Sequence, residues 1–223
     1  MKLISVEQAR ALWLFNLSDL NPRGKATESS ALAEIGKRYS FTVYPTPIDL
    51  VEAREKSLPL KFGLGTFKPK NGDAVIVDML IYRDGIMADT RSSTADSTEF
   101  IRDLLTWSTT QFGFVDHETV VKTKSVISIL HVSSDCSLPL INPKMAKFAE
   151  LLTERVPGHP GATFEVGSIG FWADQALSNQ PIPFRFERAA GEKFSENRYH
   201  SSAPLDTDVH LRTLQELEKI LTK

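Results

Sequence analysis

The stretch AVIVDMLIYRDGIMADT, residues 74–90, decides the fold class. Ala74 to Tyr82 is a run of apolar and β-branched residues that is typical of a buried strand, and the turn signal NGD precedes it. RDG, residues 83–85, separates this run from IMADT. That spacing predicts a β-hairpin, because an Asp-Gly pair supplies the positive φ that a tight turn needs.

The segments on both sides of this hairpin mix helices and strands without a regular order. Strands are expected at 39–45, 125–134, within 162–173 and within 181–190, and 60–67 is either an irregular strand or a loop. Helices are expected at 29–38, 48–56, about 100–112 and 143–155. Because β-α-β-α alternation is absent, the pattern predicts an α+β fold in which helices pack on a largely antiparallel or mixed sheet.

The two ends of the chain are both expected to be helical. Ser5 and Gln8 form a capping-box pattern, and apolar residues then recur at helical spacing, so an N-terminal helical segment is predicted over about 5–38. A C-terminal helix is predicted over about 208–221, where leucines recur every three or four residues. The only sharp candidate boundary, PGHPG at 157–161, is too short for a free linker. Residues 1–223 are therefore predicted to form a single domain.

Composition and charge narrow the classes of partner and compartment. The chain carries 26 Lys plus Arg against 28 Asp plus Glu, and this balance provides no broad positive field for nucleic acid. A single cysteine excludes an intramolecular disulfide and indicates a reducing compartment. The first residues do not read as a signal peptide, and no window reaches the roughly 18 apolar residues of a membrane span. We expect a soluble cytoplasmic protein without a membrane partner.

The run DTRSSTADSTEF, residues 89–100, has two interpretations. Asp89, Arg91, Ser92 and Ser93 could form an anion site at a helix N-terminus. The run contains no glycine, however, and its three acidic residues would repel an anion. The alternative accounts for more of the run: Asp96 caps a helix with Glu99 as its partner, and Asp89 forms a structural ion pair with Arg91.

The segment DGIMADTRSST, residues 84–94, resembles the turn and strand that follow the nucleophilic threonine in the proteasome-type threonine hydrolases. The likeness covers about a dozen residues. The place that corresponds to the nucleophile is occupied by Gly72, Asp73 and Ala74, so the resemblance implies no role for any residue of this chain.

Other combinations of reactive side chains give weaker signals. His131 and Cys136 stand at the end of an expected strand, where they would point to opposite faces, so a lone buried cysteine is the commoner outcome. The histidines show no metal-ligand spacing, and no metal or cofactor is predicted. Asp78 lies in an apolar strand, and its carboxylate would need a partner such as Arg91 or a metal.

The polar stretch from Gly191 to Asp208 is predicted to be a long loop. Loops of this length are uncommon unless they bind something or are ordered by a neighbour. Phe194, Arg198, Tyr199 and His200 are therefore interface candidates, since aromatic residues and arginine dominate binding hot spots. The alternative is that Phe194 and Tyr199 only attach the loop to its own core.

Two functions follow from these observations. The first is an interaction or assembly protein that binds another protein or itself and has no catalytic motif. The second is a phosphate- or metal-dependent enzyme, or a ligand-binding protein, with its site near Asp89 to Asp96. The sequence leans away from an enzyme because it carries no recognisable catalytic pattern.

Overall fold

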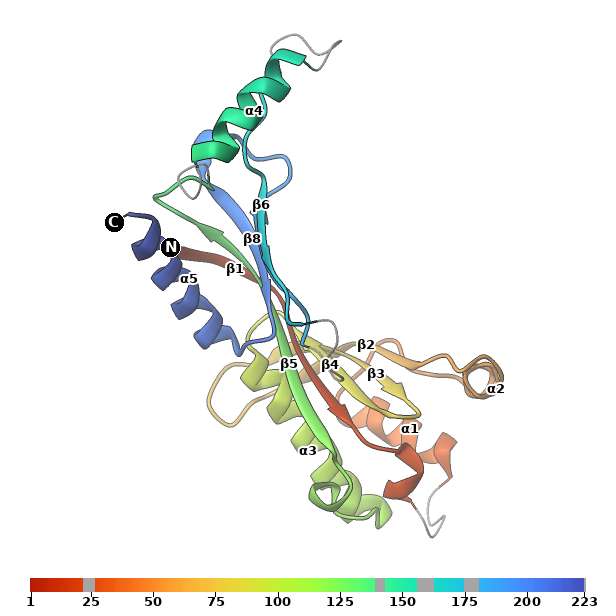
Figure 1. Cartoon of the computed structure of the whole chain (residues 1–223). Helices are drawn as coiled ribbons and strands as arrows, with labels where there is room; N and C mark the ends of the chain where they lie inside the picture. Colours follow the sequence, from red (N-terminus) through yellow and green to blue (C-terminus); the bar gives the residue numbers. More distant parts are fainter. Residues whose placement is uncertain (22–26, 139–142, 156–162, 175–180, 223) are drawn as a thin grey trace. The chain divides into compact units, whose positions relative to one another are not determined.

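The computed structural model describes residues 1–21, 27–138, 143–155, 163–174 and 181–222 (Figure 1). Its helices are α1 (Glu28–Arg38), α2 (Pro47–Lys56), α3 (Thr94–Phe112), α4 (Pro143–Arg155) and α5 (Thr207–Leu221), with short 3-10 turns that include η1 (Leu17–Leu20), η2 (His117–Thr119) and η4 (Phe194–Glu196). Its strands are β1 (Lys2–Leu14), β2 (Leu60–Phe67), β3 (Val75–Tyr82), β4 (Gly85–Thr90), β5 (Thr123–Ser133), β6 (Ser168–Phe171), β7 (Phe184–Arg188) and β8 (Arg198–Ala203).

These strands form an eight-stranded sheet in the order β2-β3-β4-β1-β5-β8-β7-β6. The β1–β4, β2–β3, β3–β4, β6–β7 and β7–β8 pairs are antiparallel. The predicted α+β class with a largely antiparallel sheet is confirmed. Contacts divide the chain into two compact units, Met1–Glu7 with Ile129–Lys223 and Gln8–Ser128. The single-domain assignment stays a prediction, and the PGHPG loop lies outside the described residues.

The N-terminal segment is a strand, and the predicted helix from Ser5 onward is wrong. Ala9, Ala11 and Trp13 are buried at every second position, and β1 pairs with β4 from Ala9↔Thr90 to Leu14↔Gly85. The same apolar residues also fit a helical spacing. Pairing with a strand far along the chain decides the outcome, because it satisfies the backbone groups and buries one face. The second part of the predicted segment, α1, is helical as expected.

The hairpin of β3 and β4 forms as predicted, in the register Tyr82↔Gly85 to Val77↔Thr90. The predicted reason is wrong, because Gly85 is not among the glycines with positive φ. A β-carbon at Gly85 would lie 2.3 Å from the carbonyl oxygen of Trp13 on β1. Glycine is therefore required here for close approach of two backbones and not for the turn.

Helix α3 begins earlier than the sequence interpretation placed it. Ser93 is its N-cap and accepts a hydrogen bond from the Asp96 amide at 3.1 Å, so Asp96 is not the cap. Glu99 instead accepts from the Lys70 amide at 2.8 Å. The helix ends at Phe112, close to the predicted end, and Gly113 caps it in the left-handed conformation with φ 67°. Ser97 attaches the helix to the sheet, because its hydroxyl donates to the carbonyl of Ala9 at 2.7 Å.

An aromatic core fills the unit Gln8–Ser128. Tyr39, Phe41 and Phe67 surround Phe100 of α3, and the Tyr39 and Phe100 rings lie 4.9 Å apart at 68°. The strand predicted at 39–45 is wrong: only an isolated bridge from Val43 to Gly63 forms there. The aromatic residues that suggested a strand are used in this core, which explains the misleading pattern. The segment 60–67 is the irregular strand β2, with a bulge between Phe62 and Gly65.

The other unit has its own core, which includes Leu130, Val132, Phe186, Tyr199 and Leu214. Helix α5, predicted at 208–221, is confirmed and lies beside strands of this unit (Figure 1). The predicted long loop at 191–208 is wrong, because it contains η4 and strand β8. Alternation in RYHSSA, with Tyr199, Ser201 and Ala203 buried, was the signal for that strand.

Candidate functional site

Asp89 is held by β1 and not by Arg91. Arg10 donates to both of its carboxylate oxygens, from Nε at 2.7 Å and from the terminal nitrogen at 2.8 Å, and Gln8 Nε2 donates at 3.1 Å. The hydrogen bonds that Arg10 donates to the Asp89 carboxylate raise the pKa of Arg10. The expected Asp89–Arg91 ion pair is therefore wrong. The bidentate geometry with Arg10 fixes two neighbouring strands side by side.

The remaining residues of the predicted anion site have structural contacts. Arg91 is exposed. The Ser92 hydroxyl donates to Thr90 Oγ1 at 3.2 Å, and Ser93 caps α3. The Thr90 and Ser97 hydroxyls lie 2.9 Å apart in the buried layer beneath. These hydroxyl groups connect the end of β4 to α3, and the anion-binding role of Asp89, Arg91, Ser92 and Ser93 stays a hypothesis.

Asp89 also lines an open hollow of about 430 Å³ on the sheet, together with Asp78, Lys61 and Leu64. Asp78 stands directly opposite Asp89 across the β3–β4 ladder. Asp78 is exposed and not buried, and its carboxylate accepts a hydrogen bond from the amide of Leu64 at 2.8 Å. Neither Arg91 nor a metal is therefore needed as its partner. Leu64 has φ 54°, which is uncommon for a branched side chain, and this hydrogen bond helps to hold the bulge of β2.

Removal of the Asp89 carboxylate should destabilise the unit Gln8–Ser128. We expect Asp89→Ala to lower the free energy of unfolding by about 1–3 kcal/mol, because Arg10 is left half-buried without its partner. Urea denaturation at pH 7 measures the effect. Asp73→Ala is the control, since Asp73 is exposed, and its effect should stay within about 0.5 kcal/mol. Equal stability of the two variants would show that the Arg10–Asp89 pair contributes little.

The predicted interface residues Phe194, Arg198, Tyr199 and His200 are placed differently from one another. Tyr199 is completely buried and stacks on Phe186 at 4.5 Å, so it is not available to a partner. Phe194 is 38% exposed and lies against the Arg188 guanidinium at 4.5 Å. Arg198 forms ion pairs with Glu192 at 3.3 Å and Glu196 at 3.5 Å. The alternative that an aromatic residue attaches this segment to its own core is thus confirmed for Tyr199.

His200 belongs to a pair of stacked histidines. Its ring lies 4.7 Å from that of His131 on β5, at an interplanar angle of 22°, and its Nδ1 lies 3.0 Å from a carboxylate oxygen of Glu7. Burial lowers the pKa of His131, and the neighbouring His200 lowers it further. Both effects disfavour the charged form of the His131 imidazole. Cys136 is a buried free cysteine, which was the commoner outcome expected from the sequence.

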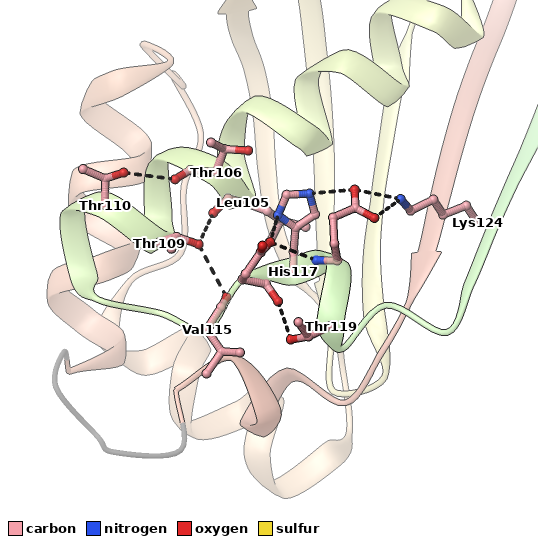
Figure 2. Close-up of polar contacts among 10 residues, drawn as sticks. Leu105, Thr106, Thr109, Thr110, Val115, His117, Thr119 and Lys124 are labelled. Carbon is pink, nitrogen blue, oxygen red and sulfur yellow. Dashed lines mark hydrogen bonds and ion pairs between the residues drawn. The ribbon is translucent and has the colours of Figure 1, made fainter.

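The sequence did not predict the polar cluster around His117, which is shown in Figure 2. His117 is 5% exposed and stacks on Trp13 at 5.7 Å, while Asp116 and Glu118 approach its two ring nitrogens at 3.5 and 3.3 Å. Lys124 bridges to Glu118 and lies 4.2 Å from the centre of the Trp13 ring. The hydrogen bond and charge of Lys124 lower the pKa of Glu118. Two carboxylates thus flank the imidazole, but its two nitrogens have no hydrogen-bond partner among the described residues, and the residue spacing gave no catalytic signal.

The described residues provide neither a metal site nor a membrane-spanning helix. Within the described ranges, no three His, Cys, Asp or Glu side chains come together in a way that could hold a metal ion. No described helix is long and apolar enough to span a bilayer. No protein-family model matches the sequence, and no curated protein matches it. Function must therefore be inferred from the surface and the cavities themselves.

Proposed function

We propose that this chain is a protein-interaction or assembly component that binds its partner at the edge strand β6. The observation that carries the proposal is the exposure of two adjacent aromatic side chains there, Phe171 at 61% and Trp172 at 60%. β6 is the last strand in the sheet order and pairs with β7. An edge strand presents backbone donors and acceptors to a second chain, and neighbouring aromatic side chains add affinity.

The aromatic side chains at this edge are held by contacts within their own unit. The Phe171 ring lies 5.9 Å from that of Phe184 on β7. The Trp172 indole lies against Gly170, where a β-carbon would come within 2.4 Å of the ring. Side chains that are already ordered lose less conformational entropy on binding. Tryptophan is also among the residues that dominate interface hot spots.

Helix α4 presents further apolar surface in the same unit. Met145, Phe148 and Leu151 are spaced three residues apart and are 47%, 53% and 42% exposed. The amide of Phe164, which precedes β6, donates to the Thr153 hydroxyl of α4 at 2.9 Å. Exposed apolar groups of this size are typical of interaction surfaces. The partner is another protein or a second copy of the chain, and both partners are cytoplasmic in this proposal.

Polar substitution of the two aromatic residues tests the proposal. We expect wild-type protein to form a defined oligomer or to capture a partner from its own cell, and the double variant Phe171→Ser with Trp172→Ser to lose that complex. Size-exclusion chromatography with light scattering and a pull-down measure the two outcomes. The loss should be at least tenfold in affinity, because truncation of one hot-spot side chain commonly costs about 2 kcal/mol.

The matched control is Ile48→Ser with Val51→Ser on α2. These residues are 72% and 55% exposed, so the control removes comparable apolar surface from the other unit. The control should keep the complex, and both double variants should keep the wild-type melting temperature. A wild-type monomer that captures nothing, or a complex that survives the β6 change, would contradict the proposal.

The second function, a phosphate- or metal-dependent enzyme or ligand-binding protein, is supported by the hollow that Asp78 and Asp89 line. A thermal-shift screen of phosphates, nucleotides and divalent cations tests it. Arg91→Ala identifies an anion site, because Arg91 is the exposed cation of the predicted set. If no compound stabilises the wild-type protein, this alternative loses its support.

A further inference from the structure

A second hollow lies within the unit Gln8–Ser128 and has the character of a small-molecule site. It has a volume of about 460 Å³ and opens between η1, α1, α2 and the turn that joins β3 to β4. Leu32 and Ile35 of α1, Leu50 of α2 and Ile81 of β3 are among its apolar lining. Pockets that bind drug-sized molecules have about 300–1,000 Å³ and are mostly apolar with a few polar groups.

Among the described residues, the charged ones that line this hollow are Arg54, Arg83 and Glu28. Arg54 pairs with Glu28 at 2.8 Å, and both side chains are more than half exposed, so their charges offset each other. Arg83 donates a hydrogen bond to the Arg54 carbonyl, which directs its side chain toward the end of α2. No carboxylate of the described residues lies within ion-pair distance of Arg83. The described residues of the lining therefore carry one net positive charge.

A positively charged lining favours a negatively charged ligand, and the N-terminus of helix α1 adds to this effect. Its N-cap Thr27 and its first-turn residues Glu28 and Ala31 line the hollow. The N-terminus of a helix carries a partial positive charge and favours an anion nearby. The C-terminal end of α2 carries a partial negative charge, which would disfavour an anion. Its Arg54 carbonyl, however, already accepts a hydrogen bond from Arg83.

We propose that this hollow binds a small amphiphilic anion, an aliphatic or aromatic carboxylate. Its apolar body lies against Leu32, Ile35 and Ile81, and its carboxylate meets Arg83. The site is separate from the edge strand β6 and does not depend on the proposed partner binding there.

Three probes with one tail and different head groups test the proposal: octanoate, 1-octanol and octylammonium. Titrations are followed by NMR on the isotope-labelled full chain, and the amides of Ala31, Ile35 and Ile81 should shift. Octanoate should bind about fivefold more tightly than octanol, since a surface ion pair contributes at most about 1 kcal/mol. Octylammonium should bind more weakly than octanol.

Substitutions separate the cavity from the charge. Ala53→Trp and Leu58→Trp each fill the hollow from a lining position. If one of these variants does not fold, the other still provides the test. Either should abolish binding of octanoate. Arg83→Gln should reduce octanoate to the affinity of octanol, whereas Arg102→Gln, an exposed arginine on α3, should leave it unchanged.

Several outcomes would overturn the proposal. These are an absence of octanoate binding, shifts confined to other regions, equal affinity for the three head groups, and undiminished binding by a folded filling variant. Because the readout is local to one unit, loss of partner binding at β6 would leave this test unaffected.

Discussion

Replacement of Gly85 by alanine is expected to lower the free energy of unfolding by about 3 kcal/mol, at the upper end of the range for overpacking a core. The new β-carbon would lie 2.3 Å from the Trp13 carbonyl oxygen. That oxygen belongs to the backbone of β1, so no side-chain rotation relieves the contact. The paired strands β1 and β4 must move apart next to Trp13, which is 1% exposed. Urea denaturation measures the loss.

Gly167→Ala is the matched control for this substitution. A β-carbon at Gly167 meets no atom within 4 Å, and the residue is exposed. Its effect should stay within about 0.5 kcal/mol. If Gly85→Ala is as stable as this control, close approach of the two backbones is not the reason for glycine at position 85.

The second large effect is a loss of stability in acid through His210. This side chain is completely buried and lies 2.9 Å from the Ser201 hydroxyl, and burial lowers its pKa from the usual 6.5 to about 4. Between these two values the unfolded chain binds a proton that the folded chain does not. The free energy of unfolding therefore falls as the pH decreases from 6.5 toward 4, by about 3 kcal/mol from this group at the lower limit.

Urea denaturation across this pH range, with His210→Gln beside the wild type, checks the sign and size. Glutamine does not titrate and can still bond to Ser201. The difference between the two proteins isolates His210 from carboxylates, which also begin to protonate below about pH 5. The wild type should lose more stability on acidification than the variant. Parallel curves would mean that burial does not lower the pKa of His210 in the folded state.

How much of the fold the sequence predicts depends on how local the deciding interaction is. The β3–β4 hairpin and the helix predicted at 48–56 depend on neighbouring residues, and both are confirmed. The strand β1 could not be recognised in this way. Its pairing partner β4 lies more than seventy residues away, and its apolar spacing fits either period.

The candidate sites follow the same rule. The sequence selected Asp89 as the residue to test, but its partner Arg10 is brought to it only by the β1–β4 pairing. At the start of α3, Ser93 and Asp96 are both acceptable caps three residues apart, and only the backbone at Ser93, with ψ 156°, selects one. The described residues that line the hollow at α1 and α2 come from segments far apart in the sequence, so composition and spacing carry no sign of it.

The division of the chain into two units has a consequence for folding during synthesis. The unit Gln8–Ser128 is continuous in sequence, whereas the other joins Met1–Glu7 to residues that begin at Ile129. As the chain emerges from the ribosome, the continuous unit can complete its contacts first. Met1–Glu7 can pack into their unit only after more than a hundred further residues have been synthesised. Contacts of such long sequence separation form slowly, because a large loop must close first. We expect the discontinuous unit to be the later and slower part of the molecule to fold.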